Sequence, residues 1–270
     1  MSNLKNEFLN LKDYSVKWEK YFSIYEKIFN KFKNKKVIFV EIGIFNGGSL
    51  QMWKNYFGEN SMIIGVDINK DCKKFENKKK NIHVIIGNQS DKDFWDDFFS
   101  KFGKIDIILD DGGHTNLDQI ITTSNVVKNI NDGGVLVIED THTSYINEYN
   151  SSNKFSFINF SKKLIDDLNS NIDLNLDINF NFSLKEYIYS IEFYESIVCI
   201  NIDKSKTIKN KEIYNKGKSH SIEDLTWIGN EIFVNKFKKY FSMIPLIRLN
   251  KFTKFLKNKI NNNIVKKFFD

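Results

Sequence analysis

Five short apolar runs constrain the fold of this chain more than any other feature. They cover residues 37–42, 62–66, 82–86, 105–109 and 135–138, and a helical stretch follows each run. Short apolar runs that alternate with helices are typical of parallel strands buried on both faces and joined by right-handed crossovers. The sequence therefore predicts an α/β fold with a doubly wound, mostly parallel sheet.

The segments around these runs predict further elements. Residues 187–202 form two adjoining β runs, which predict an antiparallel hairpin at the sheet edge. Residues 15–33 predict an amphipathic helix, because aromatic side chains recur at spacings of three and four: Trp18, Phe22, Tyr25, Phe29 and Phe32.

We expect three segments along the chain: an N-terminal helical segment (1–36), a central domain (37–202) and a C-terminal basic helical extension (203–270). Residues 143–186 break the strand–helix rhythm and are a candidate lid or insertion. Residues 247–269 predict a basic amphipathic helix with apolar residues on one face and lysines on the other.

Charge is concentrated at the C-terminal end. The formal net charge is +6, yet residues 235–270 alone carry nine lysines and Arg248 against Asp270. The rest of the chain is acidic on balance, which argues against a nucleic-acid substrate. The basic helix is a candidate for association with an anionic membrane surface or a glycosyltransferase assembly, and the alternative is docking on its own domain or on a dimer partner.

The compartment expected is the cytoplasm. The N-terminus has no apolar signal region, no run of about 18 apolar residues occurs, and Cys72 and Cys199 are the only cysteines. A homo-oligomer, such as a dimer, is also expected.

Polar residues of interest fall at the carboxyl ends of the predicted strands, where ligands bind in open α/β sheets. The turn 41–49 offers backbone N–H groups at the start of a helix. We assign four of its residues to cofactor binding: Gly43 through its backbone, and Glu41, Asn46 and Ser49 through their side chains. Asp67 ends the second strand and would hydrogen-bond ribose hydroxyls. The glycine spacing differs from the dinucleotide fingerprint, so an adenosine without a pyrophosphate fits better than NAD.

The third strand end, 87–91, offers Gln89, Ser90 and Asp91 for an adenine edge. The alternative is that Ser90 or Asp91 caps the following helix. Asp110, at the fourth strand end, is a further candidate for cofactor binding; its alternative is a turn cap.

The sharpest signal is the pairing of Asp110-Asp111-Gly-Gly-His114 with Glu139-Asp140-Thr-His142. Two neighbouring strands that each end in paired acids would gather carboxylates whose repulsion a divalent cation relieves. We expect Asp111, Glu139 and Asp140 to bind Mg²⁺, for which Mn²⁺ or Ca²⁺ can substitute. The alternative is that Asp110 and Asp132 cap turns and that one of the acids pairs with a lysine.

His114 follows Asp111 by three residues and is the expected general base. His142 is a weaker candidate for that role and, with Thr143 and Tyr145, for substrate binding. His83 and His220 are expected to be structural.

The set VEIGIFNGGSL, GVDI, LDDGGH and VIEDTHTSY resembles class I S-adenosylmethionine (SAM)-dependent methyltransferases, in particular the metal-dependent sugar O-methyltransferases of antibiotic and bacterial surface-polysaccharide pathways. The resemblance implies a Rossmann-like, seven-stranded sheet with an antiparallel last strand. It places the metal on Asp111, Glu139 and Asp140, the base at His114, the methionine part of SAM at Glu41 and Gly43, and the ribose at Asp67.

The function expected is methylation of a sugar vicinal diol, on a nucleotide-activated sugar for a capsule or other surface polysaccharide. One alternative is a metal-dependent methyltransferase acting on a catechol or another small molecule. A second is an Fe(II)-dependent hydroxylase that uses Asp111, His114 and His142 as a facial triad, although such sites usually occur in all-β folds.

Overall fold

The computed structural model describes residues 3–149, 154–172, 182–211, 213 and 215. Contacts divide the chain into two compact units, Met1–Lys211 and Glu212–Asp270. All helices and strands given below belong to the first unit. The predicted basic helix at 247–269 and His220 lie outside the described residues.

A seven-stranded sheet forms the centre of this unit, with the order β3-β2-β1-β4-β5-β7-β6. Its strands are β1 (Ile38–Ile42), β2 (Met62–Asp67), β3 (Ile82–Ile86), β4 (Ile105–Asp110), β5 (Ile130–Ile138), β6 (Ile188–Tyr194) and β7 (Ile197–Ile202). Strands β1 to β5 are parallel, and β7 runs antiparallel to both β5 and β6. The predicted doubly wound, mostly parallel seven-stranded sheet is confirmed.

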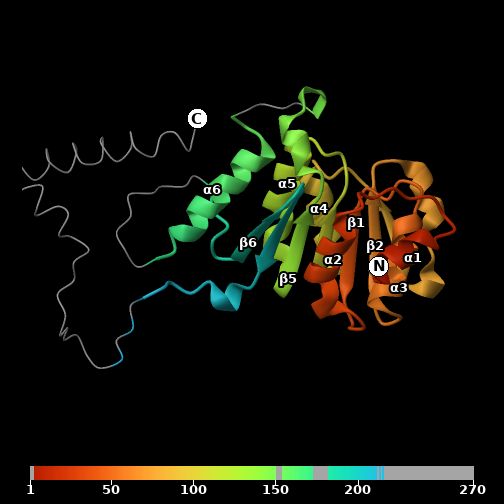
Figure 1. The fold of residues 1–270 in the computed structure, drawn as a ribbon, viewed down its shortest axis with the longest axis horizontal. Coiled ribbons are helices and arrows are strands. Elements are labelled where there is room, and N and C mark those ends of the chain that lie inside the picture. Colours follow the sequence, from red (N-terminus) through yellow and green to blue (C-terminus); the bar gives the residue numbers. More distant parts are fainter. Residues whose placement is uncertain (1–2, 150–153, 173–181, 212, 214, 216–270) are drawn as a thin grey trace, which may run out of the picture. The chain divides into compact units, whose positions relative to one another are not determined.

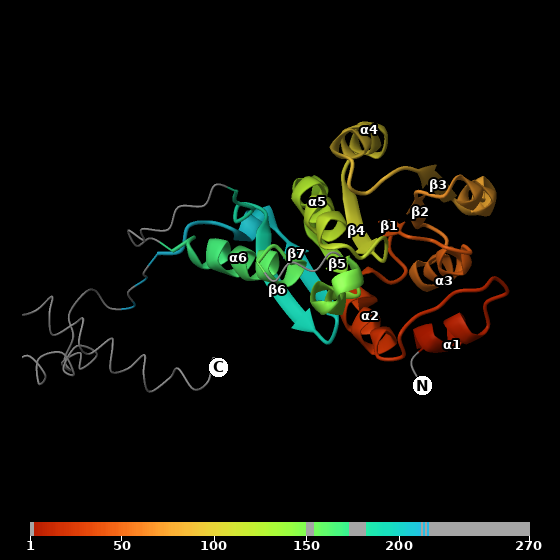
Figure 2. The same cartoon turned by 90° about the horizontal axis from the view of Figure 1, so that it is seen from above.

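Helices cover both faces of the sheet (Figures 1 and 2). On one face lie α1 (Asn3–Leu9), α2 (Tyr21–Phe29) with the 3-10 turn η1 (Asn30–Phe32), and α3 (Gly48–Phe57). On the other face lie α4 (Lys92–Phe102), α5 (Asn116–Val126) and α6 (Phe157–Asn169). Shorter 3-10 turns lie between these elements or after the last strand: η2 (Lys70–Phe75), η3 (Lys78–Lys80), η4 (Val127–Asn129), η5 (Thr141–Tyr145), η6 (Asn147–Tyr149) and η7 (Lys204–Lys206).

Two details differ from the sequence-based expectations. The N-terminal helix begins at Tyr21 instead of residue 15, so Trp18 precedes it and is 61% exposed. Strand β5 begins at Ile130, five residues earlier than expected, because the chain pairs with Ile105 before a register irregularity near Gly133 and Gly134.

The candidate lid at 143–186 contains α6, whose Phe157 and Leu164 are buried in the core on the α5 side of the sheet. This part of the segment is therefore a layer of the fold. Residues 150–153 and 173–181 of the same segment lie outside the described part of the chain.

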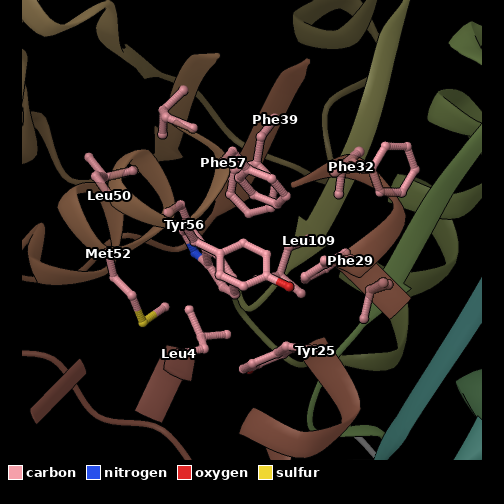
Figure 3. Close-up of a cluster of buried hydrophobic side chains, with 14 of the residues drawn as sticks. Leu4, Tyr25, Phe29, Phe32, Phe39, Leu50, Met52, Tyr56, Phe57 and Leu109 are labelled. Atoms are coloured by element: carbon pink, nitrogen blue, oxygen red, sulfur yellow. The ribbon is translucent and has the colours of Figure 1, made fainter. Parts of the chain in front are cut away.

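The core on the α1–α3 face is aromatic (Figure 3). Phe39 of β1 lies at its centre, with ring centroids 4.9 Å from Trp53 and 5.0 Å from Phe57. Tyr25 packs on the same group, 5.3 Å from Trp53 and 5.9 Å from Phe29. Side chains alternate across a strand, so Phe39 faces this cluster while Val40 faces the α4–α6 cluster.

We predict that Phe39→Ala lowers the free energy of unfolding by about 3–5 kcal/mol, because it removes a buried ring from a closely packed core. Urea denaturation measures this loss. The matched control is Phe193→Ala on β6, a phenylalanine that is 45% exposed and should cost no more than about 1 kcal/mol. Equal losses in the two variants would show that the core is not centred on Phe39.

Candidate active site

A cleft of about 530 Å³ opens at the carboxyl ends of the parallel strands. Its walls come from the loops after β1, β2, β3, β4 and β5, together with residues 15–18 from the segment between α1 and α2. The cleft spans the point between β1 and β4 where the strand order reverses, which is the usual ligand site of such sheets. Its volume suits a small molecule the size of a nucleoside.

The turn after β1 is shaped by a close approach of two loops. Gly43 has φ +80°, and a Cβ there would lie 2.1 Å from the backbone oxygen of Asp111. Only glycine combines that conformation with that contact. Gly43 therefore brings the β1 and β4 loops together at the floor of the cleft.

The other residues of this turn that were expected to bind the cofactor do not all line the cleft. Ser49 is buried near the start of α3, and its hydroxyl donates to Glu41 Oε2 at 2.6 Å. Glu41 is itself fully buried. Asn46 is exposed and is not among the described residues that line the cleft. Ser49 thus lines the cleft, whereas Glu41 lies beneath it.

Asp67 lines the cleft at the end of β2, as expected for a ribose-binding acid. Its Oδ2 accepts hydrogen bonds from the backbone N–H groups of Ile44 at 3.0 Å and Phe45 at 3.3 Å. Its Oδ1 accepts from the N–H of Asn69 at 2.8 Å. These bonds fix the carboxylate against the glycine turn.

The side chains proposed for the adenine edge mostly make internal bonds. Gln89 is buried; its Nε2 donates to Asp110 Oδ1 at 2.9 Å, and its Oε1 accepts from the N–H of Gly113 at 2.9 Å. Burial raises the pKa of Asp110 to about 6. Gln89 and Asp110 therefore brace the Gly112–Gly113 loop, and only Gln89 of the two lines the cleft among the described residues.

The two residues that follow Gln89 form hydrogen bonds with nearby parts of the chain. Asp91 is the N-cap of α4, because its side chain accepts from the N–H of Asp93. This is the alternative considered from the sequence. Ser90 donates its hydroxyl to Asp118, an acid that also accepts from Thr115 at 2.6 Å and lines the cleft. Asp118 was not foreseen as a site residue.

Three carboxylates lie on the α1–α3 side of the sheet edge. Glu41 follows Phe39 by two residues, Asp111 follows Leu109, and Glu139 follows Val137, so each continues a row of side chains that faces this core. Asp110 has the opposite parity and meets Gln89 on the other side. Alternation thus separates Asp110 from Asp111.

Lys17 lies among these three carboxylates. Its Nζ is 2.6 Å from Asp111 Oδ2, 3.4 Å from Glu139 Oε1 and 3.4 Å from Glu41 Oε1, and its side chain is 2% exposed. Burial alone would lower the pKa of Lys17, but the charges of these carboxylates outweigh that effect and raise its pKa well above the ordinary value. The cluster therefore holds a permanent internal cation.

Aromatic hydroxyls from α2 hold the acids at the end of β5. Tyr25 donates to Glu139 Oε1 at 2.5 Å, and Tyr21 donates to Asp140 Oδ1 at 2.6 Å. Burial raises the pKa of both phenols, which keeps them protonated as donors. Trp18 Nε1 also donates to Asp140 Oδ1, at 3.1 Å. Asp140 has φ +53°, which turns its side chain out of the strand line.

Asp111, His114 and Asp140 form a group that could hold a metal ion, with one ligand atom from each lying within 4.8 Å of the others. His114 Nε2 is 3.6 Å from Asp140 Oδ2 and 3.8 Å from Asp111 Oδ1. The two carboxylates suit a hard divalent cation such as Mg²⁺ or Mn²⁺. The donor set therefore fits the expected metal.

This group overlaps the predicted ligand set only in part. Asp111 and Asp140 belong to both, whereas Glu139 is 1% exposed and is engaged by Tyr25 and Lys17. His114, expected as the base, lies at the position of a possible third ligand. Proximity to both carboxylates is compatible with either role.

The candidates for substrate binding lie close by. Thr143 is buried and donates to the backbone oxygen of His114 at 2.7 Å, so it supports that loop. His142 Nδ1 hydrogen-bonds Ser196 Oγ, and Tyr145 is 72% exposed. His142 is not part of the possible metal group found among the described residues. A triad of Asp111, His114 and His142 therefore has no support, and the fold is not all-β.

Lys17, Tyr21 and Tyr25 are the functional neighbours that sequence reasoning missed. The sequence did contain a signal for the tyrosines, because Tyr21 and Tyr25 are four residues apart and lie on one face of α2. Lys17 carried no signal among the many lysines of the chain. His83 lies in β3, and its Nε2 is 3.0 Å from Asn81 Oδ1.

Comparison with known proteins identifies sugar O-methyltransferases among the relatives of this chain. No family model matches the chain. The chain is 34% identical over 173 residues to the 8-demethyl-8-alpha-L-rhamnosyl tetracenomycin-C 2'-O-methyltransferase of Streptomyces olivaceus, covering 59% of this chain and 44% of that protein. It is 34% identical over 128 residues to the mycinamicin VI 2''-O-methyltransferase of Micromonospora griseorubida, covering 45% and 31%. The chain thus spans less than half the length of these relatives.

A solved structure has a similar fold. The MycE methyltransferase from the mycinamycin biosynthetic pathway, in complex with Mg and SAH, superposes with a TM-score of 0.64 at 26% identity, covering 75% of this chain and 53% of that one. Within the described residues, no helix is long and apolar enough to cross a membrane. The resemblance found in the sequence motifs is confirmed: the chain is similar in sequence to sugar O-methyltransferases of antibiotic biosynthesis, and its Rossmann-like α/β fold matches that of MycE.

Proposed function

We propose that this chain is an O-methyltransferase that moves the methyl group of SAM to a sugar hydroxyl of a glycoside, with a divalent cation as cofactor. The observation that carries the proposal is the placement of Asp111, His114 and Asp140 together in a cleft that Asp67 and the glycine turn also line. The MycE structure was solved with Mg and SAH, which supports both cofactors.

Different residues of the cleft would bind different parts of SAM and the cation. Asp67 would accept hydrogen bonds from ribose hydroxyls, and the backbone of Gly43 lets the methionine part approach the floor. Asp111 and Asp140 would hold the cation, with Glu139 behind them. A bound divalent cation would make a coordinated sugar hydroxyl more acidic.

His114 would complete the reaction as the general base. Its Nε2 faces both Asp111 and Asp140, so a hydroxyl held at those carboxylates lies within its reach. The acceptor oxygen forms a bond to the methyl carbon, the bond from that carbon to the sulfonium sulfur breaks, and the proton goes to His114. The products are a methyl ether and S-adenosylhomocysteine.

The acceptor we favour is a glycoside rather than a sugar nucleotide or a surface polysaccharide. The relatives are named for methylation of sugars on antibiotics, and they give no support to a polysaccharide substrate. A catechol acceptor uses the same diol chemistry and remains the second candidate. Association of the basic extension with a membrane or a glycosyltransferase, and a dimer, stay predictions of the sequence.

The direct test incubates the full chain with SAM, MgCl₂ and one acceptor at a time: a rhamnosyl glycoside, a sugar nucleotide or a catechol. Mass spectrometry should detect one added methyl group on the glycoside. Excess EDTA should abolish the product, and added Mg²⁺ should restore it. Undiminished turnover in EDTA would contradict the metal-dependent mechanism, and methylation of the catechol alone would favour the second candidate.

The role of His114 can be separated from metal binding. We expect His114→Ala to reduce kcat by about 10²- to 10⁴-fold, the usual contribution of a general base, with little change in Mn²⁺ or S-adenosylhomocysteine affinity by calorimetry. Asp111→Asn should instead weaken Mn²⁺ binding. If His114→Ala also loses Mn²⁺ affinity, His114 is a ligand and not the base.

Lys17 provides a second test of the metal site. Its ammonium group contacts Asp111 and opposes a cation there, so we expect Lys17→Met to bind Mn²⁺ roughly tenfold more tightly. Without metal, the variant should lose about 3–5 kcal/mol of stability, because buried carboxylates lose their counter-charge. Calorimetry and thermal denaturation with and without Mn²⁺ measure the two effects.

The matched control for Lys17→Met is Lys20→Met, which removes a lysine paired with Glu195 at the surface, where both side chains are 71% exposed. An exposed pair contributes little, so both Mn²⁺ affinity and stability should stay close to wild type. Weaker Mn²⁺ binding in Lys17→Met would mean that Lys17 organises the ligands instead of competing with the cation.

A further inference from the structure

A second cavity of about 450 Å³ adjoins the cleft. Three parts of the chain line it: residues 18–21 before and at the start of α2, His142 in η5, and Glu195 with Ser196 in the β6–β7 turn. These parts come together because β7 pairs with β5 and brings the β6–β7 turn beside the end of β5, where the N–H of Thr141 donates to the oxygen of Ser196.

Trp18 belongs to the walls of both cavities. Its Nε1 is held by Asp140 Oδ1 at 3.1 Å, and its ring meets the His142 ring edge-on with centroids 6.2 Å apart. The side chain is nevertheless 61% exposed. An indole that is fixed at its polar edge and open on its surface is a ready platform for a flat or cyclic group.

The remaining lining is polar at the rim. Lys20 and Glu195 form an ion pair at 2.5 Å. Tyr21 donates its hydroxyl to Asp140 Oδ1 at 2.6 Å, so Asp140 is contacted by two residues that line the second cavity. A pocket with an aromatic wall and a few polar groups is typical of sites for small organic molecules.

Asp140 therefore connects the two cavities. A sugar hydroxyl held for reaction at Asp111, His114 and Asp140 leaves the rest of its molecule beside Asp140, where Trp18 and Tyr21 begin the second cavity. We propose that this cavity binds the aglycone of the glycoside acceptor, a cyclic and mostly apolar group, with Trp18 as its stacking surface. This inference rests on the proposed function. It extends that function by stating which part of the substrate the second cavity binds.

The test compares two probes that share one sugar: methyl α-L-rhamnopyranoside and 4-nitrophenyl α-L-rhamnopyranoside. The full chain is assayed with SAM and MgCl₂, and kcat/KM is determined for each probe. We expect wild type to prefer the nitrophenyl glycoside by about tenfold, chiefly through KM, which is the size of effect that aromatic stacking supplies.

Two variants remove the cavity in different ways. Trp18→Ala deletes the stacking surface, and Glu195→Trp fills the cavity from the exposed β6–β7 turn. Both should bring the two kcat/KM values to within about twofold of each other. Glu195→Trp should also keep the wild-type S-adenosylhomocysteine affinity, because Glu195 lines only the second cavity among the described residues. The matched control is Tyr189→Ala on β6, which removes an aromatic side chain that is 50% exposed and lies outside the lining of both cavities; it should keep the preference.

The outcomes separate this inference from the proposed function. If wild type methylates both probes equally, or if the preference survives in both variants, the aglycone site is wrong and the methyltransferase proposal stands. If wild type methylates neither probe and does not bind S-adenosylhomocysteine, the proposed function fails and the aglycone site fails with it.

Discussion

The ammonium group of Lys17 among Glu41, Asp111 and Glu139 is the interaction on which the site depends. Parallel pairing of β1, β4 and β5 brings these three acids to one edge of the sheet, and their common parity directs them to one face. Like charges gathered in a buried place would repel one another and raise the cost of folding. A cation supplied by the N-terminal segment offsets that repulsion within the chain itself.

This arrangement explains why the N-terminal segment is part of the active site. Residues 15–18 line the cleft, Lys17 neutralises its acidic floor, and Tyr21 and Tyr25 of α2 orient the acids after β5. The segment that the sequence predicted only as an amphipathic helix therefore supplies polar groups to the candidate site. Its helix also closes the aromatic core, so folding and assembly of the site occur together.

The sequence was sufficient to predict the order of strands and helices, because buried parallel strands leave clear apolar runs and ligands collect at their carboxyl ends. It predicted Asp111, Glu139 and Asp140 as metal ligands with His114 beside them, and the structure brings Asp111, His114 and Asp140 together. It could not predict the partners of each acid. Glu139 and Asp140 are adjacent in sequence, yet Glu139 is buried under Tyr25 while Asp140, at positive φ, turns toward the cleft. Such differences depend on tertiary contacts, as does the choice of Lys17 from many lysines.

Tyr25 joins the aromatic core to the reactive edge of the sheet. Its ring packs against Trp53 and Phe29, and its hydroxyl holds Glu139. Repacking the core could tilt the Tyr25 ring and move its hydroxyl away from the Glu139 carboxylate, even if the total volume of the core side chains stayed the same. Attempts to make the protein more heat-resistant by redesigning its interior must therefore keep the phenol where it is, since the aromatic core and the candidate site share this side chain.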